Sequence, residues 1–215
     1  MVDSNSRQGE QPGGEAGASQ VSCADCGRAY PREMFAYGRT IHCACGARVG
    51  TDPQPRPGCG EASGMRFFVD VMLGRLARWL RILGFDTAYE EDIEDEDLIR
   101  CAVDERRIIL TRDRLMPEQW RVDGIHLVNA EEPMAQLREV ADAFGLAETA
   151  RPFTRCSQCN ALLSEASEDE VAVHVPADVL EAVKYFKHCP GCDRFYWEGS
   201  HVKRMRRMLD RALGW

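Results

Sequence analysis

Long apolar runs are missing from this chain of 215 residues. No stretch approaches the ~18 apolar residues that a membrane-spanning helix needs. The first residues, MVDSNSRQGEQPGGEAGASQ, also lack the basic start and apolar core of a secretory signal. We therefore expect a cytoplasmic protein with no membrane partner. We also expect a disordered tail over residues 1–20, which offer little for a core to bury.

Positive charge is scarce as well, with 27 Lys and Arg against 35 Asp and Glu and a formal net charge of −8. This balance argues against a protein that coats nucleic acid by bulk attraction, although it leaves room for a local basic groove. The contents of 44% hydrophobic and 29% charged residues are typical of a globular protein. The length suits one ordinary domain with small additions.

Cysteine, in contrast, is abundant, with ten in the chain. Cytoplasmic thiols stay reduced, so closely spaced cysteine pairs predict metal sites rather than disulfides. Two C-x-x-C pairs follow the middle of the chain, made by Cys156, Cys159, Cys189 and Cys192. Four thiolates in such pairs bind Zn²⁺ tetrahedrally and leave no open position, so we predict a structural zinc ribbon here.

A second group of cysteines lies near the N-terminus and comprises Cys23, Cys26, Cys43 and Cys45. It predicts a second zinc ribbon, whose second pair has one spacer residue instead of two. Cys59 and His42 are alternative ligands for this site, and Cys101 is expected to be a packed thiol within a helix. The aromatic residues of GRAYPREMFAYGR are expected to form a small core, with stacking on RNA as the alternative.

The region between the cysteine groups alternates strand and helix patterns. Apolar runs predict strands in RFFV, DTAY, IILT and IHLV, and apolar residues at helical spacing predict helices over 71–84, 95–107 and 132–145. Such alternation predicts an α/β fold with a parallel sheet and helices on its faces. The expected organisation is a tail (1–20), a zinc ribbon (21–50), a linker (51–64), an α/β domain (65–150), a second ribbon (151–201) and a basic helix (202–215).

Carboxylates follow two of the predicted strands and open a predicted helix. Asp70 ends the first strand, Asp113 ends the IILT strand, and Asp95 lies at the start of the helix between them. In an open parallel sheet these side chains face one crevice at the carboxyl ends of the strands. Oxygen ligands of this kind favour Mg²⁺ or Mn²⁺, which activate water for displacement at phosphorus. The alternatives are that Asp95 caps the helix, with Asp97 as the reserve ligand, and that Asp113 is a turn residue.

Longer motifs in the same region point to a known family. The run from Asp70 to Asp86, DVMLGRLARWLRILGFD, the tetrad LTRD ending at Asp113, and YWEGSH after the last cysteine pair resemble the Mut7-C ribonuclease domain, a branch of the PIN-like nucleases. The resemblance spans roughly residues 65 to 203. It implies a PIN-like α/β/α sandwich, divalent-metal binding by the three aspartates, and single-stranded RNA as substrate. It also implies a further acidic ligand, for which Asp123 is a candidate; the alternative is that Asp123 belongs to a turn before IHLV.

Arginines near these aspartates are candidates for RNA-phosphate binding, namely Arg75, Arg78 and Arg112. The alternative is that they are solvent-facing or pair with the acidic cluster. The Thr111 hydroxyl is a candidate to orient Asp113, with a simple strand-forming role as the alternative. Tyr196, Trp197 and His201 are expected to pack the ribbon onto the α/β domain, with RNA stacking as the alternative.

The leading hypothesis is a metal-dependent endoribonuclease that hydrolyses RNA phosphodiester bonds and uses its zinc ribbons to present RNA. The basic C-terminal helix offers a contact for nucleic acid, the ribosome or RNA-processing proteins, or is a solvated helix. The competing hypothesis is a catalytically silent zinc-ribbon adaptor that binds RNA or the ribosome. The intact Asp70, Asp95 and Asp113 favour the nuclease.

Overall fold

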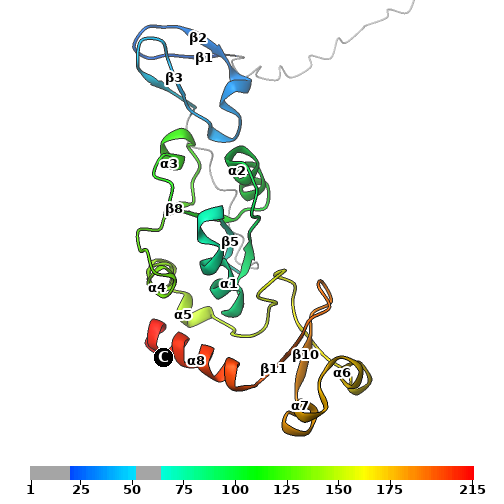
Figure 1. Cartoon of the computed structure of the whole chain (residues 1–215). Coiled ribbons are helices and arrows are strands. Elements are labelled where there is room, and N and C mark those ends of the chain that lie inside the picture. The colour runs from blue at the N-terminus through cyan, green and yellow to red at the C-terminus, as the bar shows by residue number, and fades with distance from the viewer. Residues whose placement is uncertain (1–19, 52–63) are drawn as a thin grey trace, which may run out of the picture.

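The computed structural model describes residues 20–51 and 64–215 of the chain. The predicted tail up to residue 19, the linker between residues 52 and 63, and Cys59 lie outside the described residues. In the described part, a small N-terminal module, a central α/β layer and a C-terminal module follow one another along the molecule (Figure 1). None of the helices in these ranges is both long and apolar enough to cross a membrane.

The central layer is built on a sheet of four parallel strands in the order β6-β5-β7-β8. The strands match the predicted ones: β5 (Arg66–Val69), β6 (Asp86–Ala88), β7 (Ile108–Thr111) and β8 (Ile125–Leu127). In the register, Phe68 lies opposite Ala88 on one side and Ile109 on the other. Because all four strands run the same way, their carboxyl ends share one edge of the sheet.

Helices cover both faces of this sheet, which confirms the predicted α/β/α class. Phe67 and Val69 of β5 join one core, with buried residues of α1, α4 and α5, while Phe68 joins a second core with α2 and α3. This alternation follows from the period of two along a strand. The helical elements are η2 (Val71–Leu73), α1 (Gly74–Ile82), α2 (Asp95–Asp104), α3 (Met116–Gln119), α4 (Pro133–Phe144) and α5 (Leu146–Thr149).

The N-terminal module forms a small core of its own. Phe35 is buried, and its ring meets that of Tyr30 edge to face with centroids 6.4 Å apart. These aromatics therefore serve packing, as the preferred interpretation of GRAYPREMFAYGR predicts. The module consists of β1 (Gln20–Ser22), β2 (Ala29–Pro31), η1 (Arg32–Gly38), β3 (Ile41–His42) and β4 (Arg48–Val49).

Main-chain contacts fasten this module to the segment that follows α3. Arg39 and Trp120 form an antiparallel bridge, and the Arg121 N–H donates to the Gly38 carbonyl at 2.6 Å. Gly38 has φ +78°, and a Cβ at this position would come within 2.3 Å of the Arg121 carbonyl oxygen. The close approach of the two backbones therefore requires glycine at position 38.

The C-terminal module docks against the edge strand β6. Asn160, in its first cysteine loop, accepts from the Thr87 N–H at 3.0 Å and donates to Asp86 Oδ1 at 2.8 Å. These residues begin β6, so the module covers the amino ends of the strands. Its elements are β9 (Ser164–Glu165), α6 (Glu168–His174), α7 (Ala177–Ala182), β10 (Phe186–His188) and β11 (Phe195–Trp197), with the strands in one antiparallel sheet.

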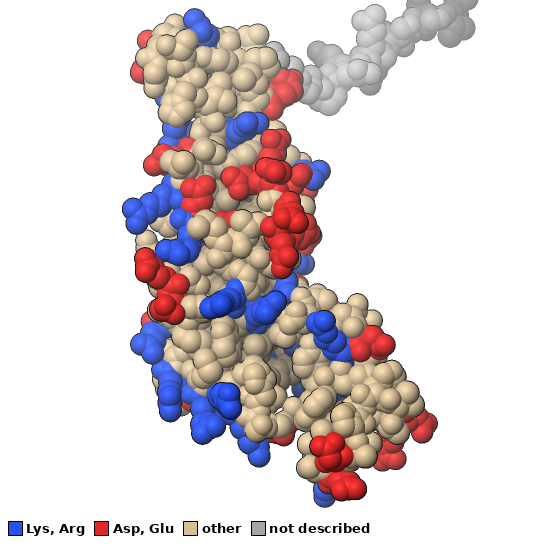
Figure 2. Space-filling view, viewed as in Figure 1, with Lys and Arg blue, Asp and Glu red and all other residues tan. Residues whose placement is uncertain are grey.

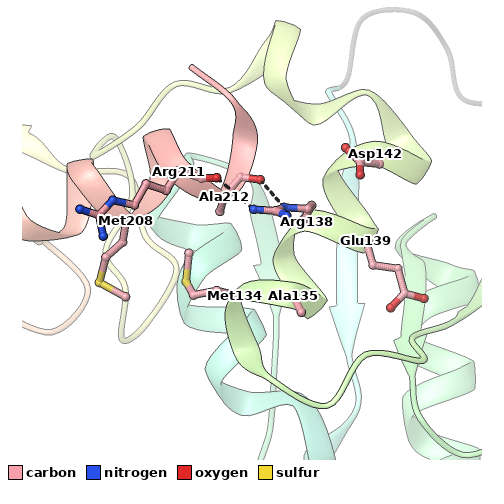
Figure 3. A pocket seen from close by; sticks show the side chains of 8 residues that line it. All are labelled: Met134, Ala135, Arg138, Glu139, Asp142, Met208, Arg211 and Ala212. Atoms are coloured by element: carbon pink, nitrogen blue, oxygen red, sulfur yellow. Dashed lines mark hydrogen bonds between the residues drawn. The ribbon is translucent and has the colours of Figure 1, made fainter.

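The last helix, α8 (Ser200–Leu213), packs on α4. Leu209 and Ala212 are buried, with Leu209 in the main core. Figure 3 shows the guanidinium of Arg138 reaching from α4 to the last carbonyls of α8, at 2.9 Å to Ala212 and 3.0 Å to Arg211. A cation at a helix C-terminus stabilises it, so this contact anchors α8 on the α/β layer.

Candidate active site and zinc sites

The three predicted aspartates lie around the carboxyl edge of the sheet. Asp70 directly follows β5 and Asp113 comes soon after β7, and these strands are neighbours. Asp95 is the first residue of α2, and Glu94, not Asp95, occupies the capping position, where no side chain makes a capping hydrogen bond. The alternative in which Asp95 caps this helix is therefore wrong. The reserve ligand Asp97 is paired with Arg100 at 2.6 Å.

A buried hydroxyl links two of these aspartates. Thr111 is fully buried and donates to Asp70 Oδ2 at 2.6 Å, while its oxygen accepts the Asp113 N–H at 2.9 Å. Asp113 Oδ1 in turn accepts the Leu115 N–H at 2.8 Å. Asp70 is only 4% exposed, so its carboxylate is held in one orientation. Thr111 thus positions Asp113 as predicted, through the backbone N–H, and orients Asp70 as well.

The pKa of Asp95 is affected by burial and by the neighbouring carboxylates Asp70 and Asp113. Partial burial raises the pKa of Asp95, and the charges of Asp70 and Asp113 raise it further. Like charges that disfavour one another in this way are relieved by a bound cation. The donor set consists of carboxylate oxygens, which suits Mg²⁺ or Mn²⁺. Within the described ranges the three carboxylates do not all approach within 4.8 Å of one another, whereas the two cysteine groups do.

The predicted phosphate-binding arginines meet in one hollow of about 520 Å³ beside this edge. Arg75, Arg78 and Arg112 all line it, and their side chains make no hydrogen bond or ion pair with another described residue. Further polar residues of the hollow were not predicted: Tyr89 and Glu91 after β6, Glu131 and Glu132 after β8, and Gln136 in α4. The candidate Asp123 precedes β8 and so lies at the opposite edge of the sheet.

A second hollow, of about 550 Å³, lies beside Asp95 and includes Arg39 of the N-terminal module. The Arg39 guanidinium lies 3.3 Å from Glu96 Oε2 and 5.7 Å from the centre of the Trp120 ring. Arg39 was not predicted, because only the docking of the N-terminal module brings it here. Figure 2 shows Asp and Glu gathered on the upper part of the central layer, around α2.

Each group of four cysteines has the geometry of a tetrahedral metal site. The recorded Sγ–Sγ distances are 3.4 and 3.7 Å in the N-terminal group (Cys23, Cys26, Cys43, Cys45) and 3.3 to 3.6 Å in the C-terminal group (Cys156, Cys159, Cys189, Cys192). Zn–S bonds of ~2.3 Å place tetrahedral sulfurs about 3.8 Å apart, whereas a disulfide needs ~2.05 Å. Both groups therefore fit zinc, and neither His42 nor Cys101 belongs to them.

The thiols also favour a cation. Burial raises the pKa of Cys156, but hydrogen bonds from the Cys159 N–H and the Tyr196 hydroxyl outweigh it and lower this pKa to about 6. Burial and the nearby Cys156 raise the pKa of Cys192 to about 12. In the other group, the Cys45 N–H and the Tyr30 hydroxyl lower the pKa of Cys43 to about 6. Four thiols so close together lose all their protons only when a cation neutralises them.

The aromatic residues of the C-terminal module have divided roles. Tyr196 contacts Cys156 Sγ at 3.0 Å, so its hydroxyl serves the cysteine site. Trp197 packs on Phe186, with ring centroids 6.2 Å apart, and also lines an open groove together with His201. These contacts lie within the C-terminal module, so the expected packing of Tyr196 and Trp197 onto the α/β domain stays a prediction.

Comparison with known proteins agrees with this geometry. The model of the Mut7-C RNAse domain matches residues 65–209, which include the sheet, the three aspartates and the C-terminal cysteine site. The N-terminal cysteine module lies outside the match. No curated protein and no solved structure matches the chain significantly. Because the match covers more than half of the sequence and the sheet has the expected topology, the chain belongs to the Mut7-C RNAse domain family.

Proposed function

We propose that the protein is a metal-dependent endoribonuclease whose catalytic centre is the carboxyl edge of the sheet. The observation that carries this proposal is the link from Asp70 through the buried Thr111 hydroxyl to Asp113, beside the crowded carboxylate of Asp95. Repulsion between carboxylates that lie together at a strand edge destabilises the fold, and groups perturbed in this way are concentrated at functional sites.

The roles of the side chains follow from their positions. Asp70 uses Oδ2 to accept from Thr111, which leaves its other oxygen for a metal ion. Asp95 and Asp113 complete the set of oxygen ligands. When bound, Mg²⁺ or Mn²⁺ supplies Lewis-acid activation of water and neutralises charge at the phosphate.

The RNA backbone is held by the arginine hollow in this proposal. Arg75, Arg78 and Arg112 are not paired with acids in the described residues, so they are available to phosphate oxygens. Arg39 approaches the same centre from the N-terminal module, beside Asp95. RNA is the substrate class that the family description supports, and the arginines give it a place to bind.

The zinc ions have a structural role in the proposal. Each cysteine site holds together a module with few buried apolar residues, and the two modules are fastened to opposite ends of the central layer. Small modules of this kind fold only with their metal. The N-terminal module thereby keeps Arg39 beside the catalytic edge.

The test is cleavage of a labelled RNA pool by the zinc-loaded full chain with Mn²⁺ or Mg²⁺. Asp70→Asn and Asp113→Asn should abolish cleavage while folding and zinc content stay intact. Asp123→Asn is the matched control, because Asp123 lies at the opposite edge and its loss should leave cleavage unchanged. Cleavage that survives both active-site substitutions would refute the proposed centre, and RNA binding without any cleavage would favour an adaptor.

A further inference from the structure

An open groove of about 520 Å³ lies between the C-terminal sheet, the segment that leads into it and the first two turns of α8. Aromatic side chains of Phe153, Tyr185 and Trp197 line it. Tyr185 is 86% exposed, so its ring is accessible to a ligand. In the described part of the chain no segment covers this ring.

Two cations lie beside Phe153. The Arg206 guanidinium lies 5.1 Å from the centre of the Phe153 ring, and Lys187 Nζ donates to the Phe153 carbonyl at 2.7 Å. Among the described residues, Arg206 pairs with the acid Glu198, at 3.6 Å in an exposed pair, and such pairs are weak. No side chain caps the start of α8, so its first N–H groups add positive potential at the groove.

The helix that borders the groove is basic throughout, in a chain whose net charge is −8. Figure 2 shows Lys and Arg gathered at the lower end of the molecule, where Figure 1 places α8. The basic residues of α8 are Lys203, Arg204, Arg206, Arg207 and Arg211, against the single acid Asp210. The local charge therefore suits a polyanion.

One face of α1 connects the groove with the catalytic edge. Arg75 and Arg78 line the arginine hollow, and Ile82, one turn further along, lines the groove. These residues lie at spacings of three and four, so they share one face of the helix. With a rise of ~1.5 Å per residue, Arg78 and Ile82 are about 6 Å apart along the axis. A short extended strand therefore reaches both sites.

We infer that this groove binds single-stranded RNA, with bases stacked on Tyr185 and Trp197 and phosphates held by Arg206 and Lys187. Exposed rings interleaved with cations are how proteins hold single strands without reading their sequence. The bound strand continues along α1 to the aspartates, which is the part of the inference that rests on the proposed nuclease function. An RNA strand accounts for the continuation into the arginine hollow, whereas a short peptide in the groove would not need it.

The binding experiment uses zinc-loaded full chain without Mg²⁺ or Mn²⁺, and a fluorescent oligouridylate of about 16 nucleotides, followed by anisotropy. Tyr185→Ala should weaken binding roughly fivefold or more. Arg206→Ala should weaken it and also reduce its dependence on salt. Glu198→Gln should strengthen binding, because it removes a negative charge from the lining of the groove. Trp215→Ala removes an exposed ring at the other end of α8 and is the control without effect.

A second arm compares cleavage of RNAs of about 4 and about 16 nucleotides. Tyr185→Ala should raise KM for the long RNA and leave kcat and the short RNA unchanged, because the short RNA does not span groove and aspartates. RNA binding at the groove without any cleavage would refute the proposed nuclease function and support the groove as an RNA-binding site. Unchanged binding by Tyr185→Ala and Arg206→Ala, or no binding by wild type, would overturn the inference. A wild-type dimer that Tyr185→Ala dissociates would also overturn the inference, because the groove would then bind a second copy of the chain.

Discussion

Replacement of Asn160 tests how the C-terminal module is attached to the sheet. Asn160→Gly removes the acceptor of the Thr87 N–H, which is fully buried, and one donor to Asp86. A buried N–H without a partner costs about 1–3 kcal/mol, and loss of the bond to the Asp86 carboxylate adds about 1 kcal/mol. Asn160 has φ +69°, so Asn160→Ala should cost about 1 kcal/mol more than Asn160→Gly, because alanine is strained there.

The assay is urea unfolding of zinc-loaded protein, followed by circular dichroism. A loss of about 2–4 kcal/mol is a large part of the ~5–15 kcal/mol that stabilises a typical domain. The loss should also depend on pH. Burial raises the pKa of Asp86, but Arg107 and Asn160 outweigh it and lower the pKa overall. The contribution of Asp86 is thus present at neutral pH and lost as pH falls through that lowered pKa. An Asn160→Gly variant as stable as wild type would refute this reasoning.

Three further predictions concern the aspartates and the cysteines. Thr111→Val should lower the free energy of unfolding by about 1–3 kcal/mol and reduce cleavage, because it leaves Asp70 Oδ2 and the Asp113 N–H without their hydrogen-bond partner. Thr111→Ser keeps the hydroxyl and should keep both stability and cleavage. Urea unfolding and cleavage rates measure the two effects. Asp95→Asn should raise the unfolding midpoint of Mg²⁺-free protein at pH 7, because a carboxyl group with a raised pKa destabilises the fold at pH values above that pKa. The gain should vanish below pH ~4, where the carboxyl group is protonated in the unfolded chain as well. An equal gain at both pH values would contradict the electrostatic cause. Native mass spectrometry should find two zinc ions per chain, and one in either Cys23→Ser or Cys189→Ser; a full complement in either variant would count against that site.

The residues at the carboxyl edge were predictable from the sequence, because apolar runs locate the strands and parallel pairing brings the strand ends to one edge. Apolar runs placed β5 and β7, and Asp70 and Asp113 follow these strands. Parallel pairing then brings the two residues to one edge whatever the details of the helices. The cysteine spacing likewise predicted both groups of four without knowledge of the fold.

The contacts between modules were not predictable in the same way. Arg39 reaches Glu96 and Trp120 across long sequence separations, and no local pattern in its segment indicates those partners. Asn160 reads as a turn residue after a cysteine pair, yet its side chain completes the hydrogen bonding of β6. Such contacts depend on how separate surfaces fit, and a single sequence does not encode that fit in its periodicity.

The position of Asn160 has a consequence for the behaviour of the chain without zinc. Strand β6 is at the edge of the sheet, and Asn160 occupies the Thr87 N–H that another strand would otherwise pair with. Cys156 and Cys159 belong to one group of four cysteines that fits a zinc ion, and an ion bound there would fix the shape of the loop that carries Asn160. Loss of zinc therefore uncovers an unpaired strand edge, which is a template for association between chains. We expect the metal-free protein to aggregate edge to edge, so zinc protects its solubility as well as its fold.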